Sequence, residues 1–166
     1  MDLPILPGII LQSGLFNAII APEETILAGL NDNPVIERYT TLFISGNFSR
    51  ILDGINRRST NFNIQRAFTV HQLLTILHET YHTIVFLEHD PTIYDDAGQV
   101  KTMIPRALKE ISHDKIVVLY TTKMDRHFSF LISNADRIYS IGTSNESGRS
   151  RRGHLIEHKN HKISDY

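Results

Sequence analysis

The run Thr83-Ile84-Val85-Phe86-Leu87-Glu88 is a continuous apolar stretch of strand length with polar ends, and it decides the fold class. Lys115–Thr121, with the sequence KIVVLYT, repeats the same pattern further along the chain. Uninterrupted apolar runs of this length are typical of strands in a parallel sheet that is covered on both faces. The segment Val100–Ser112 between them has the spacing of a helix. The two runs therefore predict parallel strands joined by a helical crossover.

The same alternation extends in both directions along the chain. Further strands are expected at Leu15–Ala21, Thr40–Ser45, Asn63–Phe68 and Arg137–Ile141, with a last one at His154–Glu157. Helices are expected at Glu23–Leu30, Phe48–Arg58, from the N-cap Thr69 to about Tyr81, and at Arg126–Ala135. Strands that alternate with helices of this length predict an α/β fold with a three-layer, doubly wound, mostly parallel sheet. We expect residues 1–142 to form this core and residues 143–166 to form a basic C-terminal hairpin or tail.

Composition excludes several classes of protein. The 166 residues are 41% hydrophobic and 21% charged, with a net charge of −1, which is ordinary for a globular domain and excludes global disorder. No apolar run approaches the roughly 20 residues of a membrane span. The absence of cysteine excludes disulfides, thiolate metal sites and thiol catalysis. The start MDLPILPGII shows no signal-peptide pattern, so a cytoplasmic location is expected.

Positive charge is concentrated in two segments of this nearly neutral chain. Residues 49–68 hold Arg50, Arg57, Arg58 and Arg66 against Asp53 alone, and the segment after Thr143 is also rich in arginine, lysine and histidine. Two interpretations are open. Such segments are often solvated surface, but a few well-placed arginines can also contact nucleic-acid phosphates without a high overall charge.

Polar residues follow several of the predicted strands. They are Pro22-Glu23-Glu24, Ser45-Gly46-Asn47, Glu88-His89-Asp90 and Thr121-Thr122-Lys123. In doubly wound folds ligands bind beyond the carboxyl ends of the strands, so these segments are the candidate ligand site. Helix capping and loop solvation are the alternative roles of the same residues.

The order of the segments resembles the ATPase core of the RecA/RadA recombinase family. The resemblance is carried by residues 7–20 before and within the first core strand, by Asn63–Gln72 before the helix that precedes the apolar run, and by Thr83–Glu88 in the Walker B position. Asn134–Tyr139 and Arg149–Glu157 resemble later segments, the latter a basic β-hairpin. The resemblance implies a truncated RecA-like P-loop NTPase core.

The phosphate-binding loop of that family is missing. A P-loop reads G-x-x-x-x-G-K-[ST] directly after the first core strand, where its amides and lysine hold phosphate. Here that place reads Ala21-Pro22-Glu23-Glu24-Thr25-Ile26, with no glycine and no lysine. Two carboxylates at this position repel phosphate. Pro22, Glu23, Glu24, Thr25 and Glu88 are therefore predicted to form a degenerate nucleotide site, with no ATP hydrolysis, no catalytic residue and no cofactor.

Degenerate members of such a family imply an accessory role. The resemblance implies a non-catalytic protein of DNA recombination or repair that binds a RecA/RadA-type recombinase and single-stranded DNA. The family's DNA loops correspond to His89–Gln99 and Thr122–His127, and its subunits associate near the N-terminal side of the core. We expect DNA contacts from Lys123, Arg126, Arg149, Arg151 and Arg152.

Two other functions compete with this interpretation. His78-Glu79-Thr80-Tyr81-His82 matches H-E-x-x-H, which on one helix binds zinc through two histidines and supplies a general base for hydrolysis. The expected end of the helix near Tyr81 argues against it, so no metal site is predicted, and His78 and His82 stand as an alternative. A regulatory domain that binds a nucleotide in the remodelled cleft is the second alternative.

Overall fold

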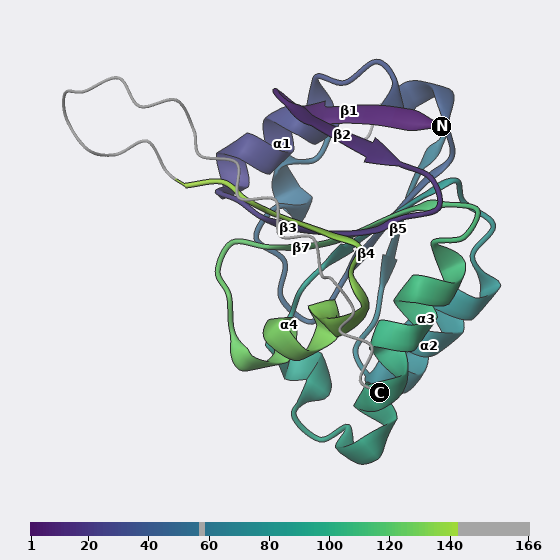
Figure 1. The fold of residues 1–166 in the computed structure, drawn as a ribbon, viewed down its shortest axis with the longest axis vertical. Coiled ribbons are helices and arrows are strands. Elements are labelled where there is room, and N and C mark those ends of the chain that lie inside the picture. Colours follow the sequence, from purple (N-terminus) through teal and green to yellow (C-terminus); the bar gives the residue numbers. More distant parts are fainter. Residues whose placement is uncertain (57–58, 143–166) are drawn as a thin grey trace, which may run out of the picture.

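A six-stranded parallel sheet forms the centre of the molecule in the computed structural model, which describes residues 1–56 and 59–142 (Figure 1). The strand order is β5-β4-β6-β7-β3-β8. The strands are β3 (Phe16–Ile20), β4 (Thr41–Ser45), β5 (Phe62–Arg66), β6 (Ile84–Glu88), β7 (Ile116–Thr121) and β8 (Arg137–Ser140). The two predicted apolar runs are β6 and β7, which lie side by side at the middle of the sheet.

Different elements cover the two faces of the sheet. One face carries α1 (Glu23–Asn31) and an antiparallel hairpin of β1 (Asp2–Leu6) and β2 (Ile9–Gln12). The other face carries α2 (Val70–Glu79), α3 (Met103–Ile111) and α4 (Arg126–Leu131) (Figure 1). Short 3₁₀ turns occupy Ile36–Arg38, Leu52–Gly54, Pro91–Tyr94, Gly98–Thr102 and Ile132–Asn134. The predicted three-layer, doubly wound architecture is confirmed.

Alternation along each central strand explains how two cores form. In β6, Val85 and Leu87 pack toward α2 and α3, whereas Phe86 packs toward the hairpin and α1. Phe86 stacks against Phe43 of β4, with ring centroids 5.6 Å apart, and lies 5.7 Å from the ring of Tyr120 in β7. Burial of each such side chain stabilises the fold by roughly 1.5–3 kcal/mol. Strands that are apolar on both faces therefore stabilise both layers of the core.

Most predicted elements occur at or within a few residues of the expected positions. Thr69 is the N-cap of α2, and its hydroxyl accepts a hydrogen bond from the Gln72 amide. The helix expected at Val100–Ser112 begins as a 3₁₀ turn and becomes α-helical only at Met103. The predicted strand His154–Glu157 and the whole segment 143–166 lie outside the described residues, so the division at residue 142 stays a prediction.

The helix expected over Phe48–Arg58 is wrong. Within the described part of this segment, only Leu52–Gly54 form a single 3₁₀ turn. The backbone amides of Phe48 and Arg50 instead donate to carboxylates at the ends of neighbouring segments, at 2.8 Å to Asp90 and 2.7 Å to Glu88. The apolar residue Ile51, which suggested a helix face, is nonetheless fully buried, in the cluster beneath the hairpin. Long-range hydrogen bonds have replaced the local helical ladder.

The β1–β2 hairpin was not predicted. Leu3 and Ile5 on β1, and Ile9 and Leu11 on β2, are buried and alternate with more exposed residues. Gly8 turns the chain between them with a φ of +80°, which favours glycine. The signal was therefore present as a period of two on both sides of a Pro-Gly turn.

We predict that Gly29→Ala weakens the contact between α1 and the hairpin. A Cβ at position 29 lies 2.4 Å from the Ile5 carbonyl oxygen and 2.9 Å from Leu6 Cδ2, so the hairpin backbone has to move. We expect a loss of about 1–3 kcal/mol in the free energy of unfolding, despite the better helix propensity of alanine. Urea denaturation measures it, with the exposed position Ala28→Ser as the control. Equal midpoints for the two variants contradict the prediction.

Candidate functional site

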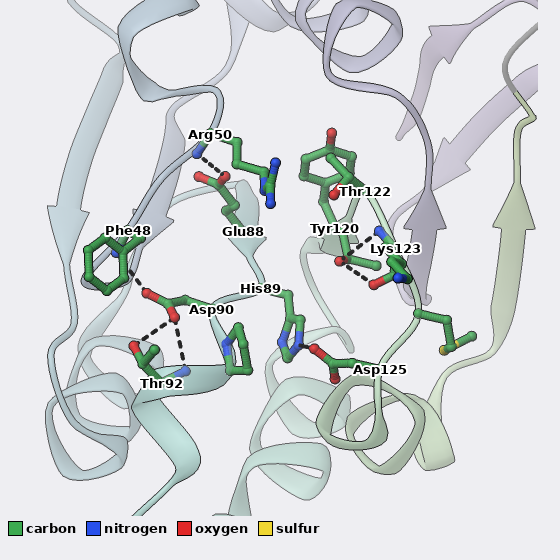
Figure 2. A pocket seen from close by; sticks show the side chains of 13 residues that line it. Phe48, Arg50, Glu88, His89, Asp90, Thr92, Tyr120, Thr122, Lys123 and Asp125 are labelled. Carbon is green, nitrogen blue, oxygen red and sulfur yellow. Dashed lines mark hydrogen bonds and ion pairs between the residues drawn. The ribbon is translucent and has the colours of Figure 1, made fainter.

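A pocket of about 420 Å³ opens at the carboxyl end of the sheet (Figure 2). It lies between the segments that follow β4, β6 and β7, which is where a doubly wound fold places ligands. Figure 2 shows Phe48 on one side and Lys123 on the other, with His89 between them. The lining residues are Phe48, Arg50, Glu88, His89, Asp90, Pro91, Thr92, Tyr120, Thr121, Thr122, Lys123, Met124 and Asp125.

Glu88 ends β6 and holds the loop that follows β4. Its Oε1 accepts the Arg50 amide at 2.7 Å, and its Oε2 accepts the Ser49 hydroxyl. The Glu88 residue is only 3% exposed. Burial raises the pKa of this carboxyl, and the hydrogen bonds from Ser49 and Arg50 oppose that rise. Glu88 therefore has a structural role, although the sequence assigned it to a nucleotide site.

Asp90 fixes the same loop from a second point. Its Oδ2 accepts the Phe48 amide at 2.8 Å, and its Oδ1 accepts the Thr92 amide at 3.0 Å and the Thr92 hydroxyl at 2.7 Å. Gly46 passes so close that a Cβ there lies 2.5 Å from Asp90 Oδ2. The loop after β4 is thus held by two buried carboxylates, and Phe48 within it is 74% exposed.

The side chains of His89 and Asp125 form a hydrogen-bonded pair at the floor of the pocket. His89 Nε2 lies 2.7 Å from Asp125 Oδ2, and the His89 side chain is 1% exposed. Burial lowers the pKa of His89, and Asp125 opposes the change. Burial acts to raise the pKa of Asp125, but the Phe128 amide and His89 together lower it. The ring of Tyr94 stacks on His89 at 5.9 Å, so the imidazole is built into the core, whereas the Asp125 side chain is 36% exposed.

The junction between β3 and α1 is too short for a phosphate-binding loop. Only Ala21 and Pro22 separate Ile20, the last residue of β3, from Glu23, the first of α1. The Tyr120 hydroxyl donates to the Ala21 carbonyl oxygen at 3.1 Å, which fixes the junction from β7. Burial raises the pKa of Tyr120, so its hydroxyl stays a donor at neutral pH.

Negative charge already occupies the start of α1. Glu23 and Glu24 lie in its first turn, where the helix dipole favours anions. Glu23 Oε1 lies 3.3 Å from Arg50 Nη1, an exposed pair with side chains 40% and 70% accessible. An ion pair this exposed is weak, so it orients the two side chains more than it stabilises the fold.

The structure separates the residues that the sequence grouped together. Pro22, Glu23, Glu24 and Thr25 belong to the start of α1 and do not line the pocket, whereas Glu88 does. Of the predicted DNA contacts, Lys123 is on the pocket wall and exposed, and Arg126 is exposed at the start of α4. Arg149, Arg151 and Arg152 lie outside the described residues.

Sequence reasoning missed part of the pocket. Ser49, which bonds to Glu88, and Arg50, which lines the pocket, were assigned to a helix, and Tyr120 was placed correctly in a strand but not in the site. The signal for the first two is the carboxylate of Glu88, which needs buried donors, but it lies about 40 residues away in the sequence. No local pattern connects the two segments.

The H-E-x-x-H geometry does not form. Helix α2 ends at Glu79, so His78 is an exposed helical residue while His82 lies beyond the helix. Both ring nitrogens of His82 already have partners, Asn63 Nδ2 at 2.8 Å and Thr80 Oγ1 at 3.0 Å. In residues 1–56 and 59–142 no group of three or more His, Asp or Glu side chains is arranged to hold a metal ion. The hydrolase alternative therefore has no supporting geometry.

Within the same described ranges, none of the helices combines the length and apolar character needed to cross a bilayer.

Fold and site together define a doubly wound α/β domain with a pocket at the carboxyl end of its parallel sheet and no phosphate-binding loop after its first sheet strand. Comparison with models of known protein families found no match. An uncharacterized protein of the archaeon Archaeoglobus fulgidus is 39% identical over 136 residues, which cover 81% of this chain and 68% of that protein. The chain belongs to the same family as this archaeal protein.

Among solved structures, the chain is similar to the flagellar accessory protein FlaH from Methanocaldococcus jannaschii, with a TM-score of 0.48 and 10% identity. The match covers 80% of this chain and 73% of FlaH.

We predict that Ser49→Ala destabilises the protein in a pH-dependent way. The variant removes a charge-assisted hydrogen bond to Glu88, worth about 1.5–3 kcal/mol when the carboxylate is ionised. In the folded protein the pKa of Glu88 is raised, so the folded state holds this proton more tightly than the unfolded state. The free energy of unfolding therefore falls as pH rises from about 4.5 through the folded-state pKa.

Loss of the Ser49 donor raises the pKa of Glu88 further and extends this window to higher pH. The difference in unfolding free energy between wild type and Ser49→Ala should therefore grow from pH 4 to pH 8. Urea denaturation at both values measures it, with the exposed residue Ser129 changed to alanine as the control. A difference that is the same at both pH values contradicts the role assigned to Glu88.

Proposed function

We propose that the chain is a RecA/RadA-like accessory protein of DNA recombination or repair that binds a recombinase and single-stranded DNA without hydrolysing ATP. One observation carries the part of the proposal that excludes ATP hydrolysis. Only two residues join β3 to α1, and Pro22 among them lacks an amide hydrogen. A loop of eight residues that cradles phosphate with its amides has no counterpart at this position.

Electrostatics at the same junction support the proposal. The Glu23 carboxylate is held at the start of α1 by Arg50. In a nucleotide-binding homologue this is where phosphate charge sits, and a second anion within about 5 Å is repelled by roughly a kcal/mol or more at intermediate dielectric. The Glu23 carboxylate, paired with Arg50, thus takes the place of a nucleotide phosphate. This favours a protein whose conformation does not depend on bound nucleotide.

The hairpin offers a surface for the recombinase. The resemblance implies association near the N-terminal side of the core, and this is where β1 and β2 lie. They form a separate two-stranded sheet, so each has one edge without a strand partner among the described residues. Ile10 of β2 is 51% exposed while its neighbours Ile9 and Leu11 are buried. An exposed apolar side chain beside a free strand edge suits strand addition by a partner.

We predict that the full-length protein binds a RadA-type recombinase and that Ile10→Asp weakens this binding at least tenfold. A charge on the hairpin opposes burial of this surface in an interface. Biolayer interferometry with immobilised recombinase measures the affinity. Met103→Asp is the matched control, because Met103 is 56% exposed on α3, on the opposite face of the sheet.

The same samples are melted with and without Mg-ATP. We expect no shift of the melting temperature, since ligand binding stabilises only the state that binds it. A shift of several degrees contradicts the absence of a nucleotide site.

Unchanged recombinase binding by Ile10→Asp contradicts the hairpin as the contact. No recombinase binding by the wild-type protein contradicts the recombinase as partner.

We predict that Arg149, Arg151 and Arg152, changed together to alanine, lower the affinity for single-stranded DNA. Each lost phosphate contact reduces the slope of log K against log salt concentration by about 0.7 for a single strand. Fluorescence anisotropy with a labelled oligothymidine at two salt concentrations measures both quantities. An affinity at low salt equal to that of the wild type contradicts a DNA contact by this segment.

A further inference from the structure

Two exposed phenylalanines lie at the same edge of the sheet, at the carboxyl ends of neighbouring strands. Phe48 follows β4 and is 74% exposed, and Phe68 follows β5 and is 50% exposed. The strands are parallel and in register, with Ser45 opposite Arg66, so the two rings emerge at the same end of the pair. Exposed aromatic side chains in a group are more informative than isolated ones, because monomeric proteins seldom leave them without a partner.

Arg66 joins the two phenylalanines into one surface. Its guanidinium lies 5.6 Å from the centre of the Phe68 ring. The same group donates to the Asn47 carbonyl oxygen at 2.9 Å, next to Phe48. The loop that carries Phe48 is in turn fixed by Glu88 and Asp90. Arg66 therefore contacts the Phe68 ring and the residue before Phe48, and the Phe48 backbone is fixed by Asp90.

Two exposed arginines lie at this edge. Arg66 is exposed, and the Arg50 side chain is 70% exposed. The nearest carboxylates, Glu88 and Asp90, are 3% exposed, and every one of their oxygens already accepts a hydrogen bond. Glu23 and Glu24 lie nearby in the first turn of α1, and Glu23 is paired with Arg50 in an exposed contact that salt and phosphate can compete with.

We infer that the β4–β5 edge surface, made of Phe48, Arg50, Arg66 and Phe68, binds single-stranded nucleic acid. Phe48 and Phe68 stack on bases, and the two arginines contact phosphates. Exposed aromatic rings interleaved with cations are the combination that binds single strands without sequence preference. Neither phenylalanine belongs to the loops His89–Gln99 and Thr122–His127, where the family resemblance implies DNA contacts, or to the segment of Arg149, Arg151 and Arg152, where we expect them from charge. The inference deepens the nucleic-acid part of the proposed function and rests on it.

The absence of tryptophan from the chain allows a local test. In Phe48→Trp the only indole lies on the β4–β5 edge surface, and a base stacked on it quenches its fluorescence. Tyr81→Trp is the matched control, since Tyr81 is an aromatic residue that is 76% exposed but lies before β6, at the opposite end of the strands. Each full-length variant is titrated with dT15, rU15 and a 15-base-pair duplex. We expect saturable quenching in Phe48→Trp with one or both single strands, and none in Tyr81→Trp.

Affinities for the same oligonucleotides, measured by fluorescence anisotropy, then show how much each residue of the surface contributes to binding. Phe48→Ala and Phe68→Ala should each bind about tenfold more weakly, whereas Phe48→Tyr, which keeps a ring, should bind like the wild type. Arg66→Gln should reduce the salt slope by about 0.7. Melting curves establish that the variants are folded. The dT15 and rU15 arms distinguish DNA from RNA as the strand bound.

Three outcomes overturn the inference. The first is binding of neither single strand by the wild-type protein. The second concerns the variants: the triple change of Arg149, Arg151 and Arg152 abolishes oligonucleotide binding, but Phe48→Ala and Phe68→Ala leave it unchanged. That result assigns the contact to the C-terminal segment alone. The third is loss of recombinase binding, without loss of oligonucleotide binding, in the phenylalanine variants, which makes the surface a protein interface. Since recombinase binding is measured separately with Ile10→Asp, either part of the proposed function can fail without the other.

Discussion

The buried carboxylate of Glu88 and the two donors that satisfy it are the interaction on which the carboxyl end of the sheet depends. A carboxylate that is 3% exposed at the end of a central strand is costly unless its oxygens are bonded. Ser49 and Arg50 supply those bonds from the loop after β4. The same contact draws the loop over the strand ends, places Arg50 beside Glu23 and, together with Asp90, leaves Phe48 facing outward. The position of the loop after β4 at the pocket, and with it the place of Phe48 on the β4–β5 edge surface, follows from this one requirement.

The sequence was sufficient for elements that owe their structure to local pattern. The apolar runs of β6 and β7 identified the centre of the sheet, and Thr69 identified the start of α2. Prediction failed where a distant partner decides the conformation. The segment from Phe48 has the apolar spacing of a helix, but its amides are used by Glu88 and Asp90 about 40 residues away. The β1–β2 hairpin is different, because the period of two along the sequence on each side of Gly8 is a local pattern that predicts two strands.

The candidate site was predicted in position but not in detail. The rule that ligands bind beyond the carboxyl ends of parallel strands directed attention to Glu88-His89-Asp90 and Thr121-Thr122-Lys123, and both segments line the pocket. The assignment of Glu88 to a nucleotide site remains untested, although its hydrogen bonds give it a structural role. Burial and hydrogen-bond partners distinguish these roles, and neither can be derived from residue type. Glu23 and Glu88 are similar in sequence context, yet one is exposed and paired with an arginine while the other is buried.

The position of β3 in the sheet has a consequence for how the chain acquires its structure. β3 is the first strand of the sheet to be synthesised, yet its two neighbours are β7 and β8, whose paired residues lie about 100 and 120 positions later. At typical translation rates of about 5–20 residues per second, β3 waits for several seconds on the ribosome before either neighbour exists. During this time the apolar face shared by the hairpin and α1 has no sheet to cover. Such non-local pairing slows folding and prolongs the time during which apolar surface is exposed to aggregation.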